Sequence, residues 1–136
     1  MKIRNTRQRQ LILDAVKSLH AKHPTAEEIY SHIESVNPGI GRATVYRNLS
    51  FLSEAGHILK IETPIPPDRF DDTLAPHYHM QCRVCGEICD ADIEYMRDIE
   101  SRVKPTDGFI IESHDITFKG ICRKCHENIV REDNAE

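Results

Sequence analysis

Two pairs of cysteines give this sequence its most specific chemical signal. Cys82 and Cys85 form one Cys-x-x-Cys motif, Cys122 and Cys125 form a second, and 36 residues lie between the two. Two residues between paired cysteines let both sulfurs face one ion from a tight turn, and two such turns complete a tetrahedral shell. Four thiolates suit Zn²⁺ and leave no open position for catalysis. We therefore predict a structural zinc site, in preference to four buried or redox-active thiols.

A second group of residues offers nitrogen and oxygen ligands. His77 and His79 are two residues apart and would share one face of a strand, and Asp90 follows the first cysteine pair. Imidazole and carboxylate ligands together favour divalent ions such as Fe²⁺, Mn²⁺ or Zn²⁺. Residue types and spacing leave two interpretations open, because His77 and His79 can be metal ligands or ordinary strand residues. They do not by themselves connect His23 or Asp71 to the same site.

Charge and proline content divide the 136-residue chain into two halves. Residues 1–62 carry 9 Lys and Arg against 6 Asp and Glu, whereas residues 63–136 carry 9 against 16 and contain all five cysteines. Three prolines within residues 63–68 prevent a helix from continuing across this boundary. The sequence therefore predicts a mildly basic half followed by an acidic, metal-binding half.

The first half has the periodicity and end signals of three helices. Apolar residues recur at helical spacing after Thr6, which we expect to cap the first helix at its N-terminus. Thr25 and Glu28 have the spacing of a capping box at the start of a second helix. A third helix is expected over residues 42–55, with Gly56 ending it.

A two-stranded wing is expected after these helices. Residues 57–62 alternate like a strand, and residues 69–71 could pair with them across the proline-rich loop. Three helices and such a wing form a winged helix-turn-helix, whose third helix enters the major groove of DNA. The side chains that would face bases and phosphates are Arg42, Thr44, Tyr46 and Arg47. The alternative is a three-helix bundle with an ordinary polar face, since an excess of three cations is a weak signal of DNA binding.

The acidic half is expected to mix strands and helix around the cysteine pairs. Cys89 should be a half-buried strand residue, and residues 93–103 have one apolar helical face that should end near Pro105. Residues 109–121 alternate like one long strand, whereas residues 132–136 have the composition of a disordered tail. Together with the winged-helix half, these elements predict an α+β fold.

The composition also bears on the compartment. No apolar run approaches the roughly 20 residues needed to span a bilayer, and the N-terminus opens onto a polar segment without a signal-peptide core. We therefore expect a cytoplasmic protein without a membrane partner. In a reducing compartment, five cysteines favour metal binding over disulfides.

Taken together, these residues resemble the Fur family of metal-dependent repressors over nearly the whole chain. The similarity rests on motifs in a fixed order: Arg-Asn-Thr-Arg-Gln-Arg (4–9), His-Pro-Thr-Ala-Glu-Glu-Ile-Tyr (23–30), Ala-Thr-Val-Tyr-Arg-Asn-Leu (43–49), Arg-Phe-Asp (69–71), His-Tyr-His (77–79) and both Cys-x-x-Cys pairs. The resemblance implies a homodimer that binds operator DNA and is not an enzyme. It also implies three regions: a winged-helix DNA-binding domain with its wing (1–72), a hinge (73–78) and a zinc-containing α/β dimerisation domain (79–136).

The resemblance further implies a regulatory site for Fe²⁺ or Mn²⁺. Five residues match, motif by motif, the ligands used by the peroxide-sensing PerR branch of the family: His23, Asp71, His77, His79 and Asp90. An ion held by all five would fix the angle between the two halves and so the separation of the two recognition helices of the dimer. In that branch Fe²⁺ reacts with hydrogen peroxide, a ligand histidine is oxidised, the metal is lost and DNA is released. By resemblance, His23 and His77 are the histidines expected to be oxidised.

Two positions point to different branches of the family. Asp90 is typical of the peroxide sensors, since iron-sensing members usually have Glu there, whereas Arg47 is more typical of iron sensors. We favour the peroxide sensor because Asp90 would contact the metal, and an iron or zinc uptake regulator is the alternative. A metal hydrolase would need a further acid–base group beside His77 and His79, and a zinc-ribbon interaction module would not bind DNA. These two hypotheses are less favoured.

Overall fold

The computed structural model describes residues 2–104 and 107–134 of the chain. The first lobe contains three helices and a two-stranded antiparallel wing: α1 (Lys2–Ser18), α2 (Ala26–Val36), α3 (Arg42–Glu54), β1 (Leu59–Ile61) and β2 (Arg69–Asp71). A 3₁₀ turn, η1 (His20–Lys22), connects the first two helices. None of the described helices is long and apolar enough to cross a membrane.

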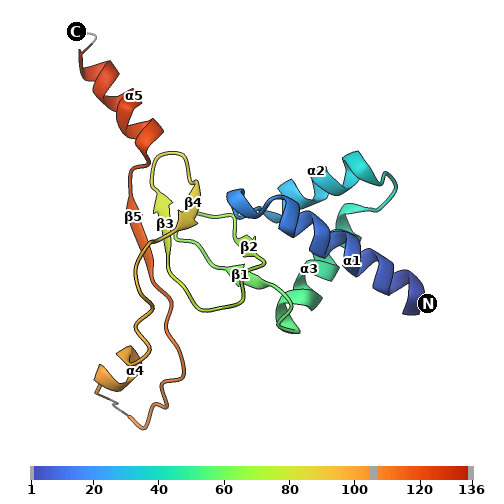
Figure 1. Ribbon diagram of the computed structural model, residues 1–136, viewed down its shortest axis with the longest axis horizontal. Coiled ribbons are helices and arrows are strands. Elements are labelled where there is room, and N and C mark those ends of the chain that lie inside the picture. Colours follow the sequence, from blue (N-terminus) through green and yellow to red (C-terminus); the bar gives the residue numbers. More distant parts are fainter. Residues whose placement is uncertain (1, 105–106, 135–136) are drawn as a thin grey trace.

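The second half is built on a three-stranded sheet. Its elements are β3 (His79–Cys82), β4 (Ile88–Asp90), α4 (Ile99–Arg102), β5 (Thr117–Gly120) and α5 (Arg123–Asn134). The strand order is β4-β3-β5, with β3 antiparallel to β4 and parallel to β5. Helices α4 and α5 extend away from this sheet in opposite directions (Figure 1). The fold is α+β, as the sequence predicts.

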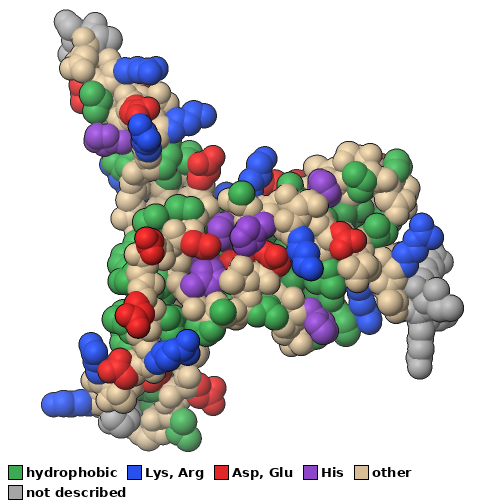
Figure 2. All heavy atoms as spheres, in the orientation of Figure 1, with side chains coloured by type: hydrophobic (Ala, Val, Ile, Leu, Met, Phe, Trp, Pro, Cys, Tyr) green, Lys and Arg blue, Asp and Glu red, His purple; other side chains and the backbone are tan. Residues whose placement is uncertain are grey.

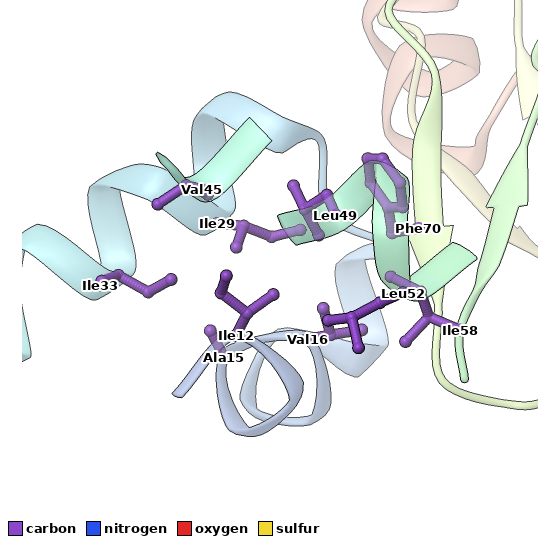
Figure 3. Packing of buried hydrophobic residues seen from close by; sticks show 10 residues of the cluster. All are labelled: Ile12, Ala15, Val16, Ile29, Ile33, Val45, Leu49, Leu52, Ile58 and Phe70. Atoms are coloured by element: carbon purple, nitrogen blue, oxygen red, sulfur yellow. The ribbon is translucent and has the colours of Figure 1, made fainter. Parts of the chain in front are cut away.

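One cluster of buried apolar side chains holds the first lobe together (Figure 3). Its members come from all three helices and from the wing: Ile12, Ala15, Val16, Ile29, Ile33, Val45, Leu49, Leu52, Ile58 and Phe70. Burying a side chain of this size stabilises a fold by about 1.5–3 kcal/mol relative to leaving it exposed. Because Phe70 of β2 belongs to the cluster, the wing is packed against the helices and Asp71, the next residue, is positioned with it.

The helix ends follow the sequence signals in two places and depart from them in one. Thr25 Oγ1 accepts a hydrogen bond from Glu28 N (3.1 Å) and Glu28 Oε1 accepts one from Thr25 N (3.0 Å), so the predicted capping box is present. Gly56 has a left-handed conformation (φ 81°) just after α3, as expected for a helix end. The prediction for Thr6 is wrong, because α1 begins at Lys2. No Gly or Pro precedes Thr6 to stop the helix there.

The strands are shorter than predicted. The first wing strand covers Leu59–Ile61 rather than residues 57–62. Of the expected strand at 109–121, only Thr117–Gly120 is a strand. It pairs along the four residues of β3, and no other described strand continues the ladder beside residues 109–116. Alternation of side chains therefore was not sufficient to form a strand without a neighbouring backbone to pair with.

Helical expectations in the second half were also partly wrong. Only Ile99–Arg102 of the expected helix at 93–103 is helical, and Pro105, which was expected to end it, lies outside the described residues. Conversely, α5 continues to Asn134, so residues 132–134 are not a disordered tail; residues 135–136 lie outside the described part. Cys89 lies in β4 as predicted, but its side chain is exposed rather than half-buried.

Candidate metal centres

The four paired cysteines come together at one end of the sheet. Cys82 ends β3, and Cys125 lies in the first turn of α5. The Sγ atoms of all four cysteines lie within 4.8 Å of one another. Cys82 Sγ accepts hydrogen bonds from the backbone N–H groups of Cys122 (3.3 Å), Val84 (3.4 Å) and Cys85 (3.5 Å). Four convergent sulfurs form the tetrahedral donor set that zinc prefers.

The ionisation of these thiols supports the same conclusion. Backbone hydrogen bonds, that of Cys122 first, lower the pKa of Cys82 to about 6. The hydrogen bond to the Cys122 side chain, together with burial, raises the pKa of Cys125 to about 12. One sulfur is therefore stabilised as a thiolate while a neighbour is held as a thiol, and all four can ionise together only when a cation compensates their charge. The donor set fits a structural Zn²⁺.

A second cluster lies where the helical lobe meets the sheet, and histidine side chains gather there in Figure 2. One ligand atom of each member lies within 4.8 Å of the others: His23, Asp71, His77, His79 and Asp90. Asp71 Oδ2 lies 2.9 Å from His77 Nε2, 3.3 Å from His79 Nε2 and 3.5 Å from His23 Nε2. Asp90 Oδ1 lies 2.9 Å from His23 Nε2 and 3.2 Å from His77 Nε2. Three imidazoles and two carboxylates thus face one point, as suits Fe²⁺ or Mn²⁺.

Strand pairing positions two of these residues. His79 of β3 stands directly opposite Asp90 of β4 in the antiparallel register, so their side chains leave the same face of the sheet. His77 precedes β3, and its Nδ1 lies 2.7 Å from the carbonyl oxygen of Ala75. An N–H at Nδ1 donates to this carbonyl and leaves Nε2 free to bind a metal.

The other two ligands are brought in by contacts between the wing and the first lobe. Phe70 N donates to Pro24 O (2.9 Å), which places Asp71 at the end of β2 beside His23. His23 follows η1 in a left-handed conformation (φ 48°), which is uncommon for a residue other than glycine and is often found at functional sites. Its Nδ1 is buried without a hydrogen-bond partner among the described residues.

The electrostatics of this cluster suit a cation. Asp71 is only 2% exposed. Burial alone would raise the pKa of Asp71, but hydrogen bonds from His23 and His79 lower it well below its usual range. Conversely, the hydrogen bond to Asp71 raises the pKa of His23 despite its burial, and the pKa of His77 is raised although burial opposes this. A site that stabilises positive charge on imidazoles when no metal is bound also stabilises a divalent ion, whose charge replaces that of the imidazole protons.

Two features of this region were not found from the sequence. Arg69 donates from Nη1 to the carbonyl oxygen of His23 (3.2 Å) and from Nη2 to that of Gly86 (3.2 Å), so it joins the helical lobe to the first cysteine turn. In the sequence, the signal that could have pointed to Arg69 was its membership of the Arg-Phe-Asp motif (69–71). His20 Nδ1 is hydrogen-bonded to Asp72 and lies 4.0 Å from Asp71 Oδ1, on the outer side of the cluster.

The residues expected to contact DNA lie on α3, where Arg42, Tyr46 and Arg47 are exposed. Two of them bind the same carboxylate of α2. Arg42 donates to Glu27 from Nη2 (2.8 Å) and Nε (3.1 Å), and Tyr46 Oη donates to Glu27 Oε2 (3.0 Å). Arg47 instead donates to Thr44 Oγ1 (3.3 Å).

Comparison with known proteins agrees with this architecture. The chain matches the model of the ferric uptake regulator family over residues 1–119. It is 34% identical over 125 residues to the peroxide-responsive repressor PerR of Staphylococcus aureus, covering 92% of this chain and 84% of the relative.

Two solved structures show the same fold. The peroxide stress regulator of Campylobacter jejuni has a TM-score of 0.73 and 28% identity, covering 91% of this chain and 93% of that one. The ferric uptake regulator of Helicobacter pylori, described as having three functional metal-binding sites, has a TM-score of 0.69 and 26% identity, covering 88% and 80%. The chain belongs to the ferric uptake regulator (Fur) family.

Proposed function

We propose that this chain is a metal-dependent transcriptional repressor of the PerR type, which releases operator DNA when peroxide oxidises a histidine of its regulatory site. The convergence of His23, Asp71, His77, His79 and Asp90 on one point is the observation that carries this proposal. The similarity to peroxide-responsive relatives supports the choice of signal. When Fe²⁺ is bound, it supplies the redox chemistry toward peroxide. The chain supplies a ring that accepts one oxygen atom, at His23 or His77.

The position of the cluster explains how metal binding would control DNA binding. His23 and Asp71 belong to the helical lobe and its wing, whereas His79 and Asp90 belong to the sheet. An ion bound by all of them fixes the two halves relative to each other. In a dimer this sets the distance between the two α3 helices, which must match the spacing of the operator half-sites. The ion thus shifts the equilibrium by its higher affinity for the DNA-competent arrangement.

Exposed apolar side chains in the second half support a homodimer. Ile93, Val103, Phe109 and Ile110 are 45–85% exposed, and they belong to the segments that form less regular structure than their sequence predicts. Large apolar side chains that stay exposed in a single chain are candidates for protein–protein contacts. A second copy of the chain would cover them, and operator DNA is the other partner of this proposal. We place the repressor in the cytoplasm and do not assign it an enzymatic activity.

The decisive experiment measures DNA binding and covalent modification on the same samples. Anaerobic protein is loaded with Fe²⁺ or with Mn²⁺, and binding to AT-rich palindromic DNA is measured before and after a brief dose of hydrogen peroxide. We expect binding to be lost in the Fe²⁺ sample only, with one oxygen added to His23 or His77. Binding that is independent of metal would refute the regulatory site.

An iron or zinc uptake regulator is the second candidate, and Arg47 favours it. In that case DNA binding follows metal concentration and ignores peroxide. The variant Asp90→Glu separates the two, because it keeps a carboxylate ligand but introduces the residue typical of iron sensors. We expect it to lose peroxide sensitivity more than it loses Fe²⁺ affinity, whereas equal peroxide sensitivity in both proteins would favour the uptake regulator.

A further inference from the structure

A cavity of about 400 Å³ lies between the wing and the second half of the molecule. It borders the cluster of His23, Asp71, His77, His79 and Asp90, here called the regulatory cluster. Two proposed metal ligands, His77 and His79, are part of its wall. Among the described residues that line it, the other three ligands, His23, Asp71 and Asp90, are not included. The cavity therefore reaches the cluster from the side of these two imidazoles.

The remaining wall mixes apolar side chains with charged ones, the latter being Lys60, Glu62 and Asp115. Its apolar part comes from Leu59 and Ile61 of β1, from Leu74 between β2 and β3, and from Ile116 just before β5. These residues come from both halves of the molecule. A small molecule in the cavity would thus meet apolar side chains over part of its surface and imidazole rings at one side.

The far wall is held in place by a chain of hydrogen bonds. His114 Nε2 lies 2.7 Å from the hydroxyl oxygen of the buried Tyr78, and its Nδ1 is hydrogen-bonded to Glu100. Tyr95 stacks on the His114 ring at 4.9 Å with an interplanar angle of 15°. Since both nitrogens of His114 are engaged and its ring is covered, this wall is preformed and does not depend on a ligand to order it.

The volume is far larger than hydrogen peroxide needs. A water molecule takes up about 30 Å³ in the liquid, so a molecule with two oxygens fills only a small part of 400 Å³. We propose that this cavity is the entrance by which peroxides reach the ligand histidines, and that it admits alkyl hydroperoxides as well as hydrogen peroxide. This inference rests on the proposed function and extends its class of signal.

The chemistry balances without a further reactant. The O–O bond of the hydroperoxide ROOH breaks, and its terminal oxygen forms a bond to a ring carbon of the histidine. The hydrogen displaced from that carbon leaves with the other oxygen as the alcohol ROH. The imidazole is oxidised by two electrons and the hydroperoxide is reduced by two, just as hydrogen peroxide would be reduced to water.

The first test compares oxidants of different size on the Fe²⁺-loaded full-length chain. Hydrogen peroxide, tert-butyl hydroperoxide and cumene hydroperoxide are each added in equimolar amount under anaerobic conditions, and oxygen addition at His77 and His23 is followed by peptide mass mapping. We expect the alkyl hydroperoxides to react within about tenfold of the rate of hydrogen peroxide, because a roomy cavity with apolar side chains in part of its wall discriminates only weakly against an added alkyl group. Oxidation by hydrogen peroxide alone would overturn this inference and leave the proposed function intact. Oxidation by none of the three would refute the proposed function itself.

The second test fills the cavity. Ile116→Trp places a large ring in the wall, and Val36→Trp, at an exposed position at the end of α2 (64% exposed), is the matched control. We expect Ile116→Trp to slow oxidation by cumene hydroperoxide at least about tenfold, with unchanged Mn²⁺ affinity, and Val36→Trp to behave like the parent. An unchanged rate in a folded Ile116→Trp protein would place the entrance elsewhere, for example beside the exposed Asp90.

A readout without iron completes the design. Cumyl alcohol, the unreactive product of cumene hydroperoxide, is titrated into the metal-free chain while the ring signals of Tyr95 and His114 are followed by NMR. We expect shifts in the parent protein and in Val36→Trp that are absent in Ile116→Trp. If Ile116→Trp fails to fold, Leu74→Trp, at a 49% exposed position of the same wall, takes its place. No shift in the parent would contradict the cavity as a binding site.

Discussion

Asp71 is the residue on which the regulatory cluster depends most. It is almost completely buried and one of its oxygens lies within 3.5 Å of three histidine nitrogens. Its other oxygen accepts a hydrogen bond from Thr73 N (2.9 Å), which fixes the carboxylate. A buried carboxylate is costly unless it is paired, so the contacts with the three imidazoles keep the Asp71 carboxylate in place.

Removing one imidazole should disable the regulatory site and spare the rest of the protein. We expect His77→Ala to keep its fold and its zinc, since His77 lies outside the cysteine cluster and is partly exposed. Mn²⁺ affinity should fall at least about tenfold, and metal-dependent DNA binding should be lost with it. Isothermal titration and a mobility-shift assay measure the two effects. His57→Ala, at an exposed position, is the control, and unchanged Mn²⁺ affinity in His77→Ala would remove His77 from the site.

Metal affinity should depend on pH in a defined direction. The hydrogen bond to Asp71 raises the pKa of His23, and the pKa of His77 is raised as well. Metals bind the neutral imidazole, so protons compete with Mn²⁺ up to pH values above the ordinary histidine pKa of about 6.5. Affinity should therefore rise with pH across roughly pH 6.5 to 8, with protons released on binding. Titrations in buffers of different ionisation enthalpy measure this, and a flat profile would contradict it.

At the scale of elements, α2 connects the proposed metal site to α3, the helix proposed to contact DNA. Its capping box begins two residues after His23, and its residue Glu27 holds Arg42 and Tyr46 of α3. The Arg42 guanidinium also lies over the ring of Tyr30, 4.7 Å from its centre. The orientation of α2 therefore affects both the position of His23 in the metal site and the position of the Arg42 and Tyr46 side chains on α3.

Loss of the capping box should destabilise the first lobe. Thr25→Ala removes the side-chain acceptor for Glu28 N, and we expect the free energy of unfolding to fall by about 1 kcal/mol. Thermal or urea unfolding followed by circular dichroism measures the change. Ser31→Ala, at an exposed position in the middle of α2, is the control and should cost nothing, because Ala has the higher helix propensity. Equal stability of the Thr25→Ala and parent proteins would show that the cap is not needed.

The carboxylate of Glu27 should weaken non-specific binding of DNA. Glu27→Gln removes a negative charge beside Arg42 and Tyr46 and leaves Arg42 free to contact phosphate. We expect tighter binding to random-sequence DNA and a steeper dependence on salt, by up to about one unit in the slope of log K against log [salt]. Glu34→Gln makes the same charge change at an exposed position of α2 and should have a smaller effect. If the two variants bind alike, the contacts between Glu27 and α3 do not influence DNA binding.

At the scale of the whole molecule, few contacts join the two halves beyond the regulatory cluster. Arg69 connects His23 to Gly86, and the buried Gln81 accepts from Ile65 N (3.1 Å) while donating to Ile65 O and Gly86 O (3.1 Å each). The Arg69 bridge ends on Gly86, directly after the first cysteine pair, and Gln81 also donates to Gly86 O within the second half. One contact between the halves thus lies next to the first cysteine turn.

Zinc should therefore be needed for the architecture of the second half. This half has a thin sheet and few fully buried apolar residues, so binding of the metal contributes directly to its folding. We expect Cys82→Ser to lose its zinc, to unfold at a lower temperature and to become monomeric. Elemental analysis, thermal unfolding and sedimentation velocity measure these changes. Cys89→Ser, outside the cluster, should keep all three properties, and a zinc-free but stable dimer of Cys82→Ser would contradict this role.

Local spacing determined the features that involve neighbours in the chain. The capping box of Thr25 and Glu28, the helix end at Gly56 and the pairing of residues 69–71 with the first wing strand were all predicted, because each depends on a few adjacent residues. The cysteine pairs were also recognisable from two-residue spacing. By contrast, the strand expected at 109–121 formed only over Thr117–Gly120, since a strand needs a partner that its own residues do not specify.

The sequence by itself therefore determined that the chain has a cysteine site and a histidine–carboxylate site. The tertiary structure decided which residues form the second site and from which side a small molecule can reach it. His-x-His and the lone Asp90 were compatible with several roles, and only the resemblance to a family connected His23 and Asp71 to them. The fold brings these residues together through the contact of the wing with Pro24 and the register of His79 opposite Asp90. The cavity beside His77 left no pattern in the sequence, and the Arg-Phe-Asp motif marked Arg69 without revealing the bridge that it forms. Such features are formed by residues far apart in the chain, whose proximity is decided by packing and strand register rather than by local spacing.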